Sequence, residues 1–176
     1  LRERRLTSGA IKALCGAGIA FTAALALRTV DARFASWYQV LLNTVVLASS
    51  ANILNLFDLR PGRAGKFFLV GLLIGAALAR EIERFGAPVL LVVVLFLPVF
   101  REDLRGRLML GDTGANFLGA ALGMGFVFWL TPHAKTVAAL ILVFLQLLSE
   151  RYSFSALIER VSILRAFDRW GRGAEE

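Results

Sequence analysis

The sequence predicts an all-α protein: a polytopic transmembrane helix bundle of about six spans, followed by a C-terminal interfacial amphipathic helix. Three observations predict this class. Apolar residues make up 57% of the 176 residues, above the roughly 45–50% of ordinary globular domains, and the mean hydropathy is +0.68. The apolar residues are gathered into long blocks, as membrane spans require. The basic residues mostly flank these blocks, and the single cysteine, Cys15, excludes a disulfide framework.

Six apolar segments are expected to cross the membrane and to form one domain over residues 1–150. A span needs about 20 residues, within a range of roughly 17–25. The third and fourth segments are shorter, so we expect them to extend into their charged flanks or to tilt, with re-entrant loops as the alternative. The segments are 11–30, 35–57, 67–79, 87–100, 114–130 and 136–148.

The distribution of positive charge predicts the orientation of the bundle. Six crossings place both ends on one side, together with fifteen of the twenty Lys and Arg residues, against five on the other side. Because Lys and Arg accumulate in cytoplasmic loops, we expect a multi-pass membrane protein with both termini, Asp58 and Asp112 in the cytoplasm. The net charge of +7 then reflects loops rather than a clustered basic face, so no nucleic acid is expected as a partner.

The tail, residues 151–176, is expected to be a cytoplasmic amphipathic segment. Its apolar residues recur at helical spacing of three and four, while arginines fall on or near the other face. Such a helix lies along the membrane interface, where anionic lipid attracts arginine; packing on the end of the bundle is an equal alternative. The apolar positions are Phe154, Leu157, Ile158, Val161, Leu164, Ala166 and Phe167.

One acidic residue stands out in the stretch LMLGDTGANFLG, residues 108–119. Asp112 lies between glycines where a predicted span begins at its cytoplasmic end. One interpretation is a helix N-cap, which satisfies free backbone N–H groups and suits the positive end of the helix dipole. The other is a ligand of Mg²⁺, which prefers one or two carboxylates together with substrate phosphates and water. The neighbouring glycines would let a phosphate approach the helix N-terminus.

A second polar group lies at the cytoplasmic end of the second predicted span. Asn52, Asn55 and Asp58 are spaced three residues apart, which places them on or near one helix face. Polar groups at membrane depth are costly and tend to face a cavity or the bundle interior. Hydrogen bonds between helices are the alternative, but three such residues ending in an acid favour a binding site.

The basic turn that follows is a candidate for binding phosphate groups. In LRPGRAGK, residues 59–66, the proline and glycine end the helix. Arg60, Arg63 and Lys66 could clamp a diphosphate. Ordinary positive charge in a cytoplasmic loop explains each of them equally well.

The two motifs together resemble the polyprenyl-phosphate sugar-1-phosphate transferase superfamily, which includes phospho-N-acetylmuramoyl-pentapeptide transferase. That family carries N-x-x-N-x-x-D-G-x-D-G and, later, M-G-D-[ST]-G-[SA]; here NILNLFD and LGDTGA occupy the corresponding places. The resemblance implies that Asp112 binds Mg²⁺ and that Asp58 and Asp112 are catalytic. It further implies that Asn52, Asn55 and Asp58 line the nucleotide-sugar pocket, that Gly111 and Gly114 flank the metal-binding aspartate, and that the protein lies in a bacterial inner membrane. With the basic residues Arg60, Arg63 and Lys66 of the preceding turn, these five residues form the expected substrate-binding set.

The chain departs from the family pattern at several points. Pro61-Gly62 stands where the second Asp-Gly pair is expected, and an upstream Asp-Asp pair and the histidine-rich motif are absent. Members usually have about ten or eleven spans, whereas six are expected here. The start at Leu1 in LRERRL and the missing acidic pair together predict an N-terminal truncation, so we expect this segment alone to be inactive.

Three functions are compatible with these features. The first is transfer of a sugar 1-phosphate from a UDP-sugar to undecaprenyl or another polyprenyl phosphate, with release of UMP, in cell-envelope glycan synthesis. Its partners would be both substrates and membrane lipid, with homodimer formation left open. The second is a non-catalytic membrane protein that binds a polyprenyl phosphate or a partner complex. The third, a transporter, is disfavoured because the polar residues gather at span ends rather than at mid-membrane.

Overall fold

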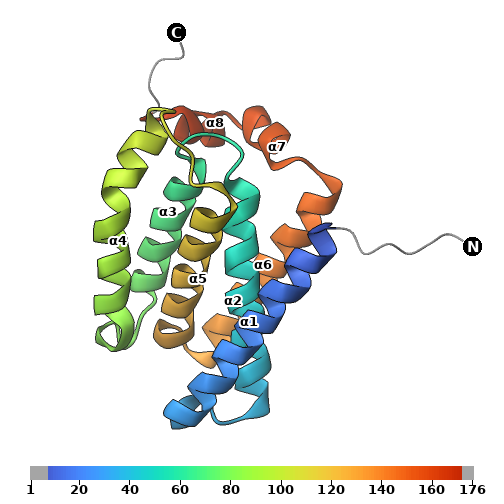
Figure 1. The fold of residues 1–176 in the computed structure, drawn as a ribbon, viewed down its shortest axis with the longest axis vertical. Helices are drawn as coiled ribbons and strands as arrows, with labels where there is room; N and C mark the ends of the chain where they lie inside the picture. Colours follow the sequence, from blue (N-terminus) through green and yellow to red (C-terminus); the bar gives the residue numbers. More distant parts are fainter. Residues whose placement is uncertain (1–7, 172–176) are drawn as a thin grey trace, which may run out of the picture.

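Helices account for all the regular secondary structure in residues 8–171, the part of the chain that the computed structural model describes. The all-α prediction is therefore confirmed. Six long helices run along the long axis of the molecule, and two short ones lie across one end of it (Figure 1). In order, the elements are α1 (Ser8–Val30), η1 (Ala32–Phe34), α2 (Trp37–Phe57), α3 (Arg63–Ala77), α4 (Glu83–Leu104), α5 (Gly111–Trp129), α6 (Pro132–Arg151), α7 (Phe154–Arg160) and α8 (Ser162–Arg169).

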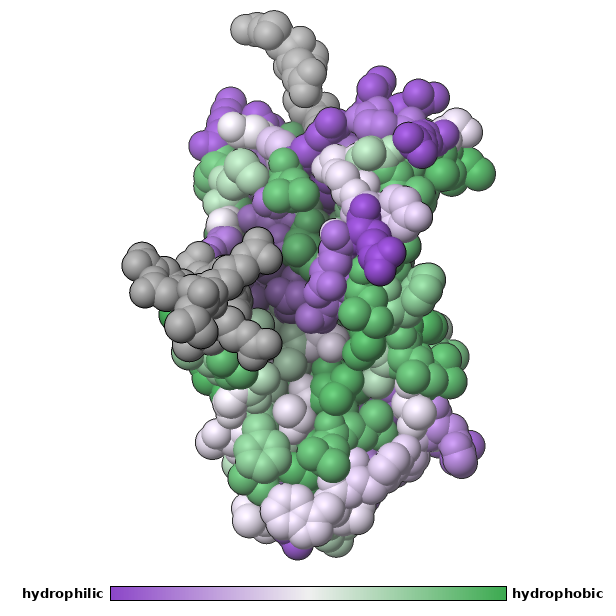
Figure 2. Space-filling view, turned by 90° about the vertical axis from the view of Figure 1, so that its right-hand side faces the viewer, coloured by the Kyte–Doolittle hydropathy of each residue, from purple (hydrophilic) through white to green (hydrophobic). Residues whose placement is uncertain are grey.

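Four of these helices, α1, α2, α4 and α6, are long and apolar enough to cross a membrane, which indicates a multi-pass membrane protein. The fourth predicted segment was expected to extend into its charged flanks, and α4 does so, with 22 residues. By contrast, α3 has 15 residues and extends about 22 Å at the usual helical rise, less than a hydrocarbon core of about 30 Å. Hydrophobic residues cover much of the mid-height surface, and hydrophilic ones gather at one end (Figure 2).

Two glycines of α5 bring it against α2 at the centre of the bundle. A Cβ atom at Gly119 would lie 2.5 Å from the carbonyl oxygen of Ser50 and 2.5 Å from the Cα atom of Ala51. One at Gly123 would lie 3.1 Å from the Cα atom of Leu47. Small residues four positions apart allow two membrane helices to approach at backbone distance. This antiparallel contact sets the register of α5 on α2, and therefore which residues meet where α2 ends.

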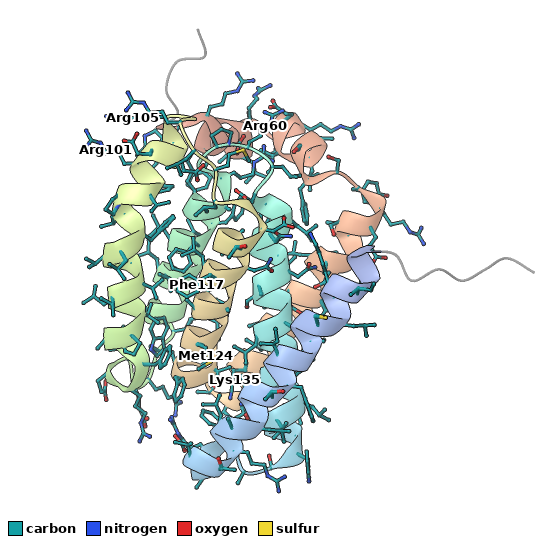
Figure 3. The ribbon with its side chains drawn as sticks, in the orientation of Figure 1. Arg60, Arg101, Arg105, Phe117, Met124 and Lys135 are labelled. Atoms are coloured by element: carbon teal, nitrogen blue, oxygen red, sulfur yellow. The ribbon has the colours of Figure 1, made fainter. Side chains whose placement is uncertain are left out.

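The bundle has two chemically different ends. The Asp112 end comprises the C-termini of α2, α4 and α6, the N-termini of α3 and α5, and the helices α7 and α8 (Figure 1). The Lys135 end is the opposite one, where α5 ends and α6 begins. Arg60, Arg101 and Arg105 lie at the Asp112 end, and Lys135 lies toward the other (Figure 3). Arg2, Arg4, Arg5 and Arg172, which contribute to the predicted charge asymmetry, lie outside the described residues.

The tail differs from the single amphipathic helix that the sequence predicts. It forms two short helices, α7 and α8, separated by Val161 in extended conformation. Phe154 and Ile158 are buried against the ends of α2 and α3, and the ring of Phe154 stacks on that of Phe57 with centroids 4.8 Å apart. The tail thus packs on the bundle end, which was the alternative prediction, while Leu157, Val161 and Leu164 stay exposed.

Candidate functional site at the Asp112 end

Asp58 lies where α2 ends, and it is the residue that closes the helix. Its backbone N–H donates to the carbonyl of Asn55 at 3.2 Å, and the side chain is half-buried. One carboxylate oxygen, Oδ1, is buried and has no hydrogen-bond partner within the described structure. A buried carboxylate oxygen without a donor is costly unless a ligand, an ion or water satisfies it.

Asp112 lies in the first turn of α5, directly after Gly111. Its side chain is 62% exposed and forms an ion pair with Lys12 of α1. The N-cap position belongs to Leu110, with no side-chain hydrogen bond to the helix N-terminus. The N-cap interpretation of Asp112 is therefore wrong, and its carboxylate is directed outward, with Lys12 as its partner.

The fold brings the two aspartates together from positions 54 residues apart in the sequence. Burial raises the pKa of Asp58; the Gly111 backbone N–H, which faces this carboxylate, opposes the rise, and the negative charge of Asp112 adds to it. A second negative charge beside a partly buried carboxylate makes this place favourable for a cation. The convergence of the two sequence motifs is the main structural feature of this site.

Asn52 and Asn55 lie on α2 below Asp58, toward the interior of the molecule. Both side chains are half-buried, and neither forms a hydrogen bond with any other residue between positions 8 and 171. The interhelical hydrogen bonds considered as an alternative for these amides are thus not formed. The amide groups remain available to an outside donor or acceptor.

The three basic residues of the predicted phosphate clamp have separate environments. Arg60 is partly exposed and pairs with Glu159 of α7 at 2.6 Å. Arg63 is 1% exposed, with Nε 2.7 Å from Oδ1 and a terminal nitrogen 3.0 Å from Oδ2 of Asp168. Lys66 is 4% exposed and donates to the Asp168 carbonyl at 2.6 Å.

The prediction that all three cations clamp a diphosphate is therefore wrong for Arg63 and Lys66 in this arrangement. Both belong to the first turn of α3 rather than to a loop, and both hold α8 against the bundle. The sequence contains a weak signal for this role, because Asp168 is the only acid between Glu159 and Glu175 in the predicted tail. Only Arg60 retains access to solvent.

The two predicted site glycines, Gly111 and Gly114, shape the start of α5, and Gly62 shapes the basic turn. Gly111 has φ 64°. Gly114 lies close to Leu110, because a Cβ atom added at Gly114 would be 3.2 Å from the Cβ atom of Leu110. Gly62 has φ 73°, and a Cβ there would be 2.4 Å from Leu104. A left-handed φ favours glycine, so the backbone conformation of this turn explains why glycine follows Pro61.

The residues present partly fit a Mg²⁺ ion. Asp58 and Asp112 supply the one or two carboxylates that Mg²⁺ takes alongside phosphate and water, and the unsatisfied Oδ1 of Asp58 is suitable as a ligand atom. No group of three or more His, Cys, Asp or Glu residues with metal-binding spacing occurs in the described residues. Protein ligands alone therefore do not complete a coordination shell.

An apolar groove, which the sequence did not indicate, opens beside this site between α4 and α5. It has a volume of about 290 Å³, and Gly114, Leu110 and Phe117 line it from the α5 side. Phe117 is exposed on α5 (Figure 3). The remaining lining residues are Val92, Leu95, Phe96, Val99, Met109 and Leu118. The groove extends from apolar side chains of α4 to Gly114, in the helix turn that carries Asp112.

Comparisons with protein-family models, with curated proteins and with solved structures find no match for this chain. The functional argument therefore depends on the geometry and chemistry of the site.

Proposed function

We propose that this chain carries part of the active site of a membrane transferase that moves a sugar 1-phosphate from a UDP-sugar to a polyprenyl phosphate. The observation that carries the proposal is the proximity of Asp58, where α2 ends, to Asp112 in the first turn of α5. The resemblance of NILNLFD and LGDTGA to the transferase motifs supports the same conclusion. We further propose that α3 and α5 also traverse the membrane and that the Asp112 end is cytoplasmic.

In the proposed reaction, an oxygen of the lipid phosphate attacks the β-phosphorus of the UDP-sugar. The bond from that phosphorus to the bridging oxygen breaks, and UMP leaves with the electron pair. Asp58 and Asp112 would hold Mg²⁺, which when bound offsets the negative charge of the diphosphate and of the leaving group. The chain's own contribution is to position both substrates and to hold fixed charges around them.

Each neighbouring feature has a role in this scheme. The N-terminus of α5 at Gly111 presents backbone N–H groups that favour a phosphate. The amides of Asn52 and Asn55 are free to bind polar groups of the nucleotide sugar. The α4–α5 groove suits the hydrocarbon chain of the acceptor lipid, and exposed Arg60 draws anionic substrates toward the site.

The test is Asp112→Asn, with Mg²⁺-dependent release of UMP as the measurement. We expect a loss on the order of 100-fold or more, the effect typical of removing one preorganised charge contact. Glu150→Gln is the matched control, because Glu150 is an exposed acid at the same end and should leave turnover unchanged. Turnover like that of the wild type in Asp112→Asn would reject the metal-binding role.

A non-catalytic lipid-binding protein is the second candidate, favoured by one specific observation. Arg63 and Lys66 are committed to α8, and Lys12 pairs with Asp112, so few cations remain for a diphosphate. On this alternative the protein binds a polyprenyl phosphate tightly, but releases no UMP with or without Mg²⁺.

A further inference from the structure

A second pocket lies at the Lys135 end, on the far side of the molecule from the paired aspartates. It has a volume of about 310 Å³, is open to the outside, and is lined by η1, the start of α2, the end of α5, the start of α6 and the α3–α4 turn. Arg33, Arg80 and Lys135 line it, with Glu81 as the one acidic residue of the wall. The other lining residues are Phe34, Gln39, Val127, Phe128, Trp129, Leu130, Thr131 and Pro132.

Lys135 is the unusual residue of this wall. The sequence places it in an outer loop, TPHAK, yet it belongs to the first turn of α6 and is 2% exposed. Its Nζ atom donates to Oε1 of Gln39 at 2.8 Å and to Oδ1 of Asn43 at 3.0 Å, and it lies 4.9 Å from the Phe34 ring centroid. These contacts are neutral, and Lys135 forms no ion pair with any residue that the structure describes.

A buried ammonium without an acidic partner is unusual, because taking a charge out of water is costly unless an opposite charge accompanies it. An ammonium has three N–H donors, and the two amide oxygens account for two of them. One donor and the whole positive charge therefore remain for a ligand in the pocket.

Trp129 supplies a second, independent observation. It is 4% exposed, it lines the pocket, and its indole N–H is buried without a hydrogen-bond acceptor in the described structure. The six-membered ring of Trp129 faces Gly125 and Gly75, and the ring atoms nearest to these glycines are its Cζ3 and Cε3. The N–H is on the opposite edge of the indole, so it is directed away from these glycines. Buried indole N–H groups usually have a partner.

The remaining charges at the rim are partly paired. Arg33 contacts Asp31 at 2.7 Å and Glu81 at 3.3 Å, and Arg84, just outside the lining, also contacts both acids. Arg80 is exposed, and no ion pair of its side chain occurs within the part of the chain described. The only acid of the wall is thus neutralised, and the positive charges of Arg80 and Lys135 are not.

We propose that this pocket is a binding site for a phosphate group, with Lys135 and the Trp129 indole N–H as inner donors and Arg80 at the entrance. Phosphate supplies several acceptor oxygens and negative charge, which match two unsatisfied donors and two uncompensated cations. The group can belong to a small soluble phosphate or to the headgroup of an anionic lipid, because aromatic residues at a bundle end lie at headgroup level. This site is separate from the proposed transferase centre.

The first experiment measures the unfolding temperature of the purified chain in neutral detergent while inorganic phosphate is titrated against chloride at constant ionic strength. A ligand that binds only the folded state raises this temperature in a saturable way. We expect that response in the wild type, and at least tenfold weaker phosphate binding in Lys135→Met. Arg151→Met is the matched control, since Arg151 is exposed at the opposite end, and should respond like the wild type.

Two further variants keep the test decisive if Lys135→Met does not fold. Trp129→Phe removes the N–H but keeps an aromatic ring, and Arg80→Gln changes only an exposed side chain; both should weaken phosphate binding several-fold.

The same series of variants in nanodiscs of phosphatidylcholine, with and without phosphatidylglycerol, identifies the source of the phosphate. Stabilisation by phosphatidylglycerol alone that depends on Lys135 indicates a lipid headgroup, and stabilisation by inorganic phosphate alone indicates a soluble ligand. Absence of both effects in the wild type, or equal effects in all variants, overturns the proposal.

Discussion

At the residue scale, the fold places Asp58 where its charged form is disfavoured. Burial is the main cause, and the nearby Asp112 adds to it. A carboxyl whose pKa is higher in the folded than in the unfolded state binds its proton more tightly when folded. Its contribution to stability therefore declines as the pH rises from the ordinary pKa of 3.8 to the folded-state value, and is lowest above that value.

Asp58→Asn should consequently resist thermal unfolding better than the wild type at neutral pH, in detergent without divalent cations. The variant removes a charge that the folded state disfavours, so its stability should also depend less on pH above about 4. Melting curves recorded from about pH 4 to pH 7 test this. An Asn variant that is less stable at pH 7, with an unchanged pH profile, would show that the carboxylate stabilises the fold.

The ion pair between Arg63 and Asp168 gives a second prediction at this scale. Both side chains are almost fully buried, at 1% and 3% exposure, and Ser155 adds an acceptor for Arg63 at 2.8 Å. Asp168→Ala leaves a buried guanidinium without its carboxylate, and breaking such a pair costs about 3–5 kcal/mol. We expect α8 to detach from the bundle, and limited proteolysis with trypsin should then cleave within the tail, after Arg165 or Arg169.

Glu159→Gln is the control for this change. Glu159 pairs with Arg60 and, at 3.5 Å, with Arg169 of α8, but the side chains of Arg60, Glu159 and Arg169 are 40%, 33% and 67% exposed. Such surface pairs contribute about 1 kcal/mol or less. Equal protease sensitivity of the two variants would mean that α8 is held by apolar contacts instead.

At the element scale, the contact between α2 and α5 depends on Gly119. A Cβ there meets backbone atoms of Ser50 and Ala51 at 2.5 Å, and a backbone cannot yield as a flexible side chain does. Gly119→Ala should destabilise the protein by about 1–3 kcal/mol, the usual cost of overpacking. It should also separate Asp58 from Gly111, and so reduce the proposed transferase activity.

Gly16→Ala is the matched substitution, because nothing lies within 4 Å of a Cβ at that position of α1. Alanine is the better helix former by about 0.5–1 kcal/mol, so this variant should be as stable as the wild type or slightly more so. Thermal melts of both variants side by side provide the comparison. A neutral Gly119→Ala would contradict the close α2–α5 contact.

At the scale of the whole molecule, the bundle separates its charges along the long axis, and this separation predicts its orientation in the membrane. Arg107 is exposed at the Asp112 end, and His133 is exposed at the Lys135 end. In a Cys15→Ser background, Arg107→Cys should resist a membrane-impermeant maleimide in spheroplasts and react after lysis. His133→Cys should react in both preparations.

This labelling pattern follows from the positive-inside rule applied to six crossings. Reaction of both cysteines in intact spheroplasts would mean that the number of spans between them is even, and that α5 does not cross the membrane. The reverse pattern would place the paired aspartates outside the cytoplasm and would remove access to a UDP-sugar.

The all-α class, the apolar segments and the candidate aspartates followed from the sequence alone, because hydropathy and helix-end residues act locally along the chain. Tertiary structure decided which polar residues meet. Asp58 and Asp112 come together because Gly119 and Gly123 set the register of α5 on α2, a contact between residues about 70 positions apart. Arg63 and Lys66, which the sequence suggested were loop charges, hold α8 against the bundle in the structure. Lys135 is a buried cation there. Burial and pairing depend on neighbours from other helices, and the local spacing of residues carries no information about those neighbours.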